Sequence, residues 1–274
     1  MKKTFSLIII GVLFAGVIFS GCKNVDNTAG TITKTPLKPN YSKYTALAEN
    51  LKASADSYKA YLEKNVKKSS AKAKFIKSEI AENFYGFTCD FDNNGTKEIL
   101  LYSYNNKPEN PENIYSVYTL KNNQPKIIAS KKKNYISYVG KERGCVGIVS
   151  KNGKNYIFEV KSTSPTDFSE VRRTYDYKIY GVKNNELKKL RTARWVEVNT
   201  AVGKKYHKEF PQALTKSQYK IDGKKVAKNK FVSYFNSFKF TNLKKTASVE
   251  KDGFYITSTA ANPNKLLKQV KNMK

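Results

Sequence analysis

The spacing of apolar residues along this chain changes near residue 84, from a helical period to simple alternation. Between Tyr41 and Val66, apolar residues recur at alternating steps of four and three, which places them on one helical face. The residues on this face are Tyr44, Ala48, Leu51, Ala55, Tyr58 and Leu62. The pattern predicts a helix over 41–66 that packs on its own domain or, as the alternative, forms a coiled-coil seam with a partner.

The helical segment is expected to extend to residue 83. A stretch rich in Lys, Ser and Ala, Lys67–Lys74, is expected to break or loosen the first helix. Phe75–Ile80 then predicts either a short second helix or an edge strand. Strand-like patterns begin at Phe84.

From that point apolar and polar residues alternate, which is typical of strands with one buried face. The strand-like segments after residue 110 are Ile114–Leu120, Lys126–Ser130, Tyr135–Val139, Cys145–Ser150, Tyr156–Lys161, Thr174–Val182 and Leu187–Val198. Between them lie the pairs Asn122-Asn123, Asn152-Gly153 and Asn184-Asn185, whose residue types tolerate the positive φ of tight hairpin turns. The pattern therefore predicts an antiparallel β-meander in an open, curved or partial propeller-like sheet.

The C-terminal part mixes short elements. Thr200–Thr215 looks irregular, and Tyr219–Val226 predicts a short strand around an Asp-Gly turn. Helices are expected over Asn229–Phe238 and Asn264–Met273, with a last strand at Phe254–Thr257. Together the patterns predict an α+β fold that is mainly β, with an N-terminal helix, an antiparallel meander and short C-terminal helices.

The N-terminus contains a predicted targeting signal. Met1-Lys2-Lys3 precedes an apolar run, Phe5–Phe19, that is too short for a comfortable membrane span. The following Ser20-Gly21-Cys22 resembles the lipobox of bacterial lipoprotein signal peptides. The resemblance implies cleavage before Cys22 and acylation of that cysteine, which would anchor the chain on the extracytoplasmic face of the cell membrane. An ordinary secretory peptide and an uncut anchor are the alternatives.

The predicted organisation has four parts. Residues 1–21 are the signal peptide, 22–40 a flexible tether, 41–83 the helical segment and 84–274 the β-rich body. The tether is expected because Lys23–Asn40 contains Thr, Asn, Gly and two prolines and has no apolar period.

The net charge of the chain limits the classes of partner that it is expected to bind. Lys and Arg number 51 against 22 Asp and Glu, a net charge of +29, and losing Lys2 and Lys3 with the signal peptide would leave +27. Such a charge favours an anionic wall polymer, anionic lipid or nucleic acid. Arginine is scarce and the lysines are spread singly, which argues against nucleic acid, whose readers gather both on one element. A solvated lysine-rich surface is the simpler interpretation.

The candidate chemistry lies in the loop between the first two predicted strands. Asp90, Asp92, Asn94 and Glu98 place oxygen side chains at loop positions 1, 3, 5 and 9, and Gly95 occupies the sharp turn. Odd-numbered spacing turns these oxygens to one side, which suits a hard cation such as Ca²⁺. The alternative is a plain hairpin whose carboxylates cap backbone N–H groups.

This loop resembles the calcium-type loop, Asp-x-Asp-x-Asp-Gly-x-x-Glu, of uncharacterised lipoproteins from Gram-positive (Firmicutes-type) bacteria. In that family the loop follows a helical segment and precedes an aliphatic strand, here Ile99–Leu101, and a β-rich body. The resemblance implies a location at the cell membrane and an overall architecture, but it implies no activity. An EF-hand would need Glu at position 12, which is Leu101, so a helix–loop–helix site is rejected. The carbonyl of Thr96 is predicted as a further ligand of a structural Ca²⁺.

No reaction is indicated by the sequence. It contains no Gly-x-Ser-x-Gly motif, no phosphate loop and a single histidine, His207. The prediction is therefore a binding or interaction module without catalytic residues, whose partner is an anionic wall polymer or another protein. The alternative is a hydrolase acting on a cell-wall or extracellular polymer, which a cleft holding two carboxylates ~5–9 Å apart would favour.

Three kinds of residue allow two interpretations each. Cys89 and Cys145 could form a disulfide or stay as buried thiols. Trp195 is predicted as a core residue with its N–H satisfied, and the alternative is an exposed stacking platform. The abundant tyrosines could likewise stack on bases or sugars, or fill a half-buried antiparallel sheet.

Overall fold

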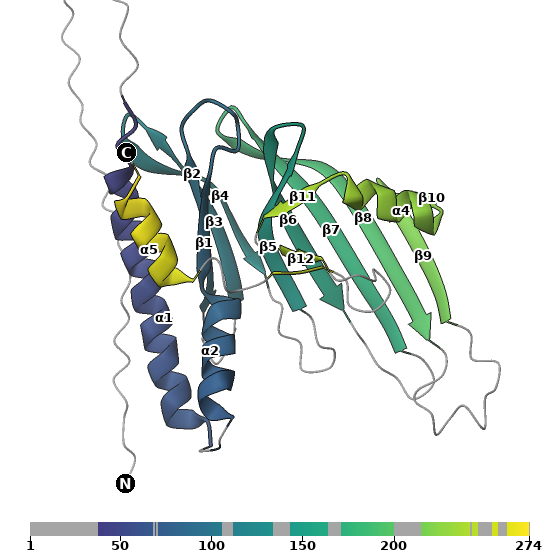
Figure 1. The fold of residues 1–274 in the computed structure, drawn as a ribbon, viewed down its shortest axis with the longest axis horizontal. Helices are drawn as coiled ribbons and strands as arrows, with labels where there is room; N and C mark the ends of the chain where they lie inside the picture. The colour runs from purple at the N-terminus through teal and green to yellow at the C-terminus, as the bar shows by residue number, and fades with distance from the viewer. Residues whose placement is uncertain are drawn as a thin grey trace, which may run out of the picture. The chain divides into compact units, whose positions relative to one another are not determined.

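The computed structural model describes residues 38–67, 69, 71–105, 112–133, 143–163, 171–199, 215–241, 243–245, 254–256 and 262–273. All of them belong to one compact unit, Leu37–Lys274. The predicted signal peptide, Cys22, the tether up to residue 37 and the strand predicted over Tyr135–Val139 lie outside the described residues. The predicted fold class is confirmed, because the unit is mainly β, with antiparallel sheets, an N-terminal helix and short C-terminal helices (Figure 1).

The N-terminal helices pack onto the unit itself. A 3-10 turn, η1 (Tyr41–Tyr44), leads into α1 (Thr45–Asn65), and α2 (Lys72–Asn83) follows. The predicted apolar face, from Tyr44 to Leu62, is buried except for the half-buried Tyr58. Most of it packs in one cluster with residues of α5 (Pro263–Lys271) and of the first strands. The stripe therefore packs on its own domain, and a helix is the structure observed at Phe75–Ile80.

Most strands form two antiparallel sheets in which neighbouring strands are consecutive in the chain, with one exception at the edge of the second sheet. The first sheet has the order β1-β2-β3-β4. Its strands are β1 (Tyr85–Cys89), β2 (Glu98–Asn105), β3 (Glu112–Lys121) and β4 (Gln124–Lys133). The second has the order β10-β9-β8-β7-β6-β5-β11. Its strands are β5 (Arg143–Lys151), β6 (Lys154–Thr163), β7 (Val171–Lys183), β8 (Glu186–Asn199), β9 (Thr215–Ile221), β10 (Lys224–Val226) and β11 (Lys239–Thr241). The predicted meander is thus divided between two sheets, and β12 (Leu243–Lys245) pairs separately with β13 (Phe254–Ile256).

The hairpin turns are of the predicted kind. Asn122-Asn123 joins β3 to β4 with φ of 52° and 58°, and Asn184-Asn185 joins β7 to β8 with φ of 54° and 57°. Asn152-Gly153 joins β5 to β6 in the same way, with φ of 51° and 74°. Positive φ at both central residues gives these turns the twist of the flanking strands, and Asn and Gly adopt it at low cost.

Two apolar cores lie on opposite faces of the seven-stranded sheet. One joins it to the first sheet, with Tyr85 and Tyr115 packed in a cluster with Ile157. The other lies under α4 (Lys228–Asn236), where Phe158 packs with Phe235. Because successive residues of β6 enter different cores, this strand is buried on both faces.

Trp195 belongs to the core under α4 and is fully buried, as predicted. Its ring stacks on Tyr175 with centroids 4.6 Å apart. Its N–H was predicted to have a partner, and this is wrong for the described part of the chain, where Nε1 has no hydrogen bond. The tyrosines also fill the cores, since most of those on described strands are buried. They therefore follow the packing interpretation rather than that of a stacking surface.

Replacing Gly86 with Ala is expected to destabilise the unit by ~1–3 kcal/mol, the usual cost of overpacking a filled core. A Cβ at this position would lie 2.5 Å from Leu266 Cδ2 and 2.8 Å from the backbone oxygen of Leu100. Thermal unfolding measures the effect. Gly181→Ala is the control, because its nearest neighbour is the exposed side chain of Leu190. An unchanged midpoint for Gly86→Ala would contradict the close packing of α5 on β1.

Candidate metal centre

The candidate site lies in the connection between β1 and β2, residues 90–97. Strands flank it on both sides, in agreement with the rejection of an EF-hand. Phe91 inside the loop and Ile99 and Leu100 after it are buried, so both ends of the loop are fixed in the core. Gly95 has φ of +84°, a left-handed conformation that explains a glycine at the tip of the turn.

Three carboxylates converge in this loop. Each of Asp90, Asp92 and Glu98 offers an oxygen, and these oxygens all lie within 4.8 Å of one another. Glu98 has no exposed surface, whereas Asp90 and Asp92 are half-buried. Like charges held this close repel one another unless a cation or protons lie between them. The triad can therefore hold a metal ion.

Glu98 is the most constrained member of the triad. It accepts the N–H of Phe91 at 2.8 Å and the hydroxyl of Thr119 at 3.3 Å. The pKa of its carboxyl is raised to about 7, mainly by burial and also by the two aspartates, while the two hydrogen bonds oppose the shift. No lysine or arginine of the described chain forms an ion pair with it. Among the described residues, its charge therefore lacks a cationic partner.

The aspartates also shape the turn. Asp90 accepts the N–H of Asn94 at 3.2 Å and that of Gly95 at 2.9 Å, and Asp92 accepts the N–H of Asn94 at 3.2 Å. Burial is the main cause that raises the pKa of the Asp92 carboxyl. This capping was the alternative to cation binding, but the two are compatible, because a carboxylate offers about four lone-pair sites.

The other two predicted ligands are the side chain of Asn94 and the backbone carbonyl of Thr96. The side-chain oxygen of Asn94 accepts the N–H of Thr96 at 2.6 Å, and its Nδ2 donates to Asp92 at 2.9 Å. Asn94 therefore closes the turn. The Thr96 carbonyl stays a prediction as a ligand. The structure thus brings together three of the side chains predicted from the sequence.

Residues far away in the sequence hold the loop in place through hydrogen bonds. The Tyr41 hydroxyl accepts the N–H of Lys97 at 3.0 Å, and the Tyr44 hydroxyl lies 3.0 Å from the carbonyl oxygen of Lys97. Asn155 of β6 donates to the carbonyl of Asp90 at 3.1 Å. Sequence reasoning missed these residues because their role depends on tertiary contacts alone.

Thiolate ligation is not expected at this site. Cys89 is half-buried at the end of β1, and burial raises the pKa of its thiol to about 12. No disulfide joins it to Cys145, so the oxidised alternative is not observed. Among the described residues, the titratable side chains grouped at the candidate centre are therefore all carboxylates.

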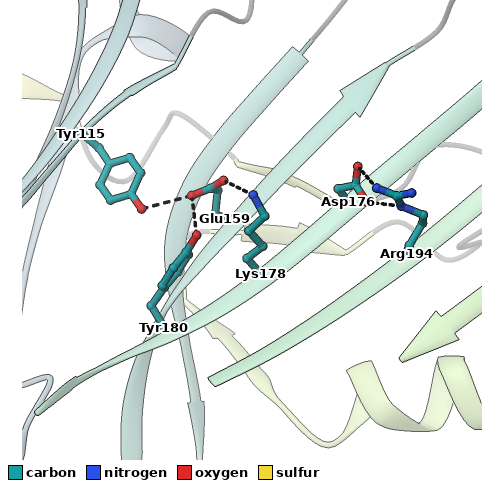
Figure 2. Close-up of polar contacts among 6 residues, drawn as sticks. All are labelled: Tyr115, Glu159, Asp176, Lys178, Tyr180 and Arg194. Atoms are coloured by element: carbon teal, nitrogen blue, oxygen red, sulfur yellow. Dashed lines mark hydrogen bonds and ion pairs between the residues drawn. The ribbon is translucent and has the colours of Figure 1, made fainter. Parts of the chain in front are cut away.

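A second buried carboxylate, Glu159, lies between the two sheets (Figure 2). It accepts the hydroxyl of Tyr115 at 3.1 Å and that of Tyr180 at 3.3 Å, and Lys178 Nζ lies 3.5 Å away. Tyr115 belongs to the first sheet, so its bond joins the two sheets. This role could not be predicted from the sequence, because Glu159 resembles an ordinary polar position of a strand.

Figure 2 also shows the neighbouring pair of Arg194 and Asp176. Arg194 donates from Nε at 2.5 Å and from its terminal nitrogen at 3.1 Å, a bidentate geometry. Both side chains are partly exposed, so the pair is expected to contribute little to stability.

Comparisons with known protein families, curated proteins and solved structures found no match. No helix in the described part of the chain is long and apolar enough to cross a membrane. The interpretation of the site therefore depends on the chemistry of its own residues.

Tyr115→Phe is expected to destabilise the unit by ~1.5–3 kcal/mol, because it removes a hydrogen bond to a buried carboxylate. In a Glu159→Gln background the same change should cost less, with a coupling of ~1 kcal/mol or more in a double-mutant cycle. Chemical denaturation of the four proteins measures it. Additive effects would show that the hydroxyl does not bind the carboxylate in solution.

Proposed function

We propose that this chain is a lipid-anchored extracytoplasmic binding module whose first β-hairpin holds a structural Ca²⁺ ion. The observation that carries the ion assignment is Glu98, a fully buried carboxylate with two further carboxylates beside it and no described cationic partner. A bound cation would supply the missing charge. The resemblance of the loop to the calcium-type loops of Gram-positive lipoproteins supports the same assignment.

Calcium suits this ligand set better than other divalent ions. Ca²⁺ takes six to eight oxygens in flexible geometry, which an irregular loop supplemented by water and backbone carbonyls can provide. Mg²⁺ demands a near-ideal octahedron, and Zn²⁺ prefers thiolate and imidazole ligands. The triad offers only carboxylates.

The location of the protein at the membrane is proposed from the sequence. The apolar run that ends at Ser20-Gly21-Cys22 supports lipidation, and two acyl chains give stable anchoring where one is marginal. The high positive charge supports a binding role toward anionic surfaces.

Calcium is expected to raise the thermal midpoint of the metal-free chain from Lys23 to Lys274. Binding to the native state alone stabilises it by ~2.7 kcal/mol at a hundredfold excess over Kd, and Mg²⁺ should do less. Calorimetry in chelator and then in millimolar Ca²⁺ measures the shift. Equal midpoints for a chain shown to be metal-free at the start would mean that the loop is only a turn.

Glu98→Gln is expected to abolish the response to Ca²⁺ and to stabilise the metal-free chain by ~1–3 kcal/mol at pH 8. The folded pKa of about 7 lies above the usual range, so ionisation at pH 8 opposes folding when no cation is bound. Glu159→Gln is the matched control, since it removes an equally buried carboxylate outside the loop. A full Ca²⁺ response in Glu98→Gln would exclude the triad as the site.

Cys22→Ala is expected to abolish incorporation of labelled lipid and to release the protein into the medium or leave an uncut precursor. Metabolic labelling followed by membrane fractionation measures both effects. Unchanged lipid incorporation in the variant would contradict the proposed anchor.

A further inference from the structure

Hairpin turns of both sheets gather at one end of the unit, and we propose that this end docks onto an anionic lipid bilayer. We call it the turn end; it comprises the loop 90–97 and the turns 122–123, 152–153 and 184–185. The inference rests on the proposed lipid anchor, which determines the surface that the unit faces. It adds which side of the unit meets the membrane and which residues hold it there.

Contacts between distant residues assemble the turn end together with the start of the described chain. Asn123 accepts the N–H of Asn40 at 2.9 Å and donates to the carbonyl of Lys38 at 3.3 Å. Lys97 in the loop bonds to the hydroxyl of Tyr41, and the loop in turn bonds to the start of β6. The register of β6 and β7 brings the turn 184–185 beside the turn 152–153 (Figure 1). The tether therefore enters the unit at the turn end.

Exposed lysines cover this end. They are Lys38, Lys43, Lys97, Lys121, Lys154 and Lys183. None of the six forms an ion pair with a described acidic side chain. On α1, by contrast, Lys52 and Lys59 pair with Asp56 and Glu63. Within the described part of the chain, these six ammonium groups have no acidic partner to leave when they meet lipid phosphates, and their grouping at one end suits an extended anionic surface.

The acidic groups at the turn end do not oppose this assignment. Glu186 pairs with Lys188 next to the turn 184–185. The loop carries the triad of Asp90, Asp92 and Glu98, whose charge the proposed Ca²⁺ would largely neutralise. The remaining field at this end is positive.

The length of the tether favours the same orientation. About 16 residues separate Cys22 from Lys38, and a flexible chain of that length has an end-to-end distance of ~20–25 Å. α1 begins at the turn end, and its 21 residues extend ~30 Å away from it. Because the field of a charge is screened over ~8 Å at physiological salt, only lysines at the contacting end attract the bilayer.

A bilayer fits this surface better than a linear polyanion. The lysines come from separate turns, so they spread over an area instead of following one groove. A membrane presents its phosphates in a plane within reach of the tether. Each lysine close to an anionic surface strengthens binding about fivefold, which adds to the effect of the acyl chains.

The test uses the chain from Lys23 to Lys274, which retains the whole compact unit. Binding is measured to vesicles of mixed anionic and zwitterionic lipid and to vesicles of zwitterionic lipid alone. Changing the six turn-end lysines to Gln should weaken binding to the anionic vesicles ~100-fold, as expected for about three lysines in contact. Changing them to Arg should preserve binding and shows that charge is the cause. Thermal midpoints confirm that each variant is folded.

A charge-matched control changes six exposed lysines outside the turn end to Gln. They are Lys64, Lys67, Lys74, Lys77, Lys224 and Lys230. This variant has the same net charge as the turn-end variant. Its binding should fall less than ~3-fold, because four of these lysines lie at the far end of α1 and on α2, and the other two lie on the edge strand β10 and on α4, outside the four turns.

Equal losses in the two Gln variants would overturn the proposal and leave a general attraction of a highly charged chain. Equal binding to zwitterionic vesicles would overturn it as well. Lysine-dependent binding to soluble polyphosphate without binding to vesicles would assign the surface to an anionic polymer instead. Because this chain lacks Cys22, a failure of lipidation leaves the measurement unaffected, and repeating it in chelator separates it from the calcium proposal.

Discussion

The burial of Glu98 is the constraint on which the N-terminal half of the unit depends. Its carboxylate holds the N–H of Phe91 inside the loop and the hydroxyl of Thr119 on β3, so it ties the loop to the first sheet. The hydroxyls of Tyr41 and Tyr44 in η1 then bond to the backbone of the preceding residue, Lys97. These contacts form only if the carboxylate stays buried, and its charge must then be balanced by a proton or a cation.

Comparison with Glu159 shows why only one of the two buried glutamates indicates an ion site. Glu159 is surrounded by donors, two tyrosine hydroxyls and the ammonium group of Lys178. Its position between the sheets is therefore balanced by the protein itself. The groups closest to Glu98 include two more carboxylates, which add to the repulsion. Equal burial thus has opposite consequences, depending on the charge of the neighbours.

Local features of the fold could be predicted from the sequence, and features that depend on distant contacts could not. The helical period of 41–66 and the Asn-rich turns act within a few residues, and both appear in the structure. The division of the meander into two sheets was not predicted, because it depends on packing across the first core. β6 is buried on both faces, so its alternation could not show that Glu159 faces another sheet.

In the candidate site, too, the sequence predicted some features and missed others. The spacing of Asp90, Asp92 and Glu98 predicted their convergence, since all three lie in one short loop. The spacing predicted Asn94 as a ligand in the same way as the three carboxylates. In the structure its amide instead closes the turn through hydrogen bonds. An Asn side chain can bond to its own backbone as readily as to an ion, and only the geometry distinguishes the two.

The cation site and the basic surface lie at the same end of the unit, so their electrostatics are linked. An empty triad places negative charge beside Lys97, where it would repel lipid phosphates and weaken the field of the nearby lysines. A bound Ca²⁺ would largely cancel that contribution without moving any lysine. Under the two proposals, the ion would do more than hold a hairpin together: its occupancy would set how strongly the turn end is attracted to the membrane. Since the separation between loop and lysines is short, this coupling would persist at physiological salt, where longer-range charge effects are screened.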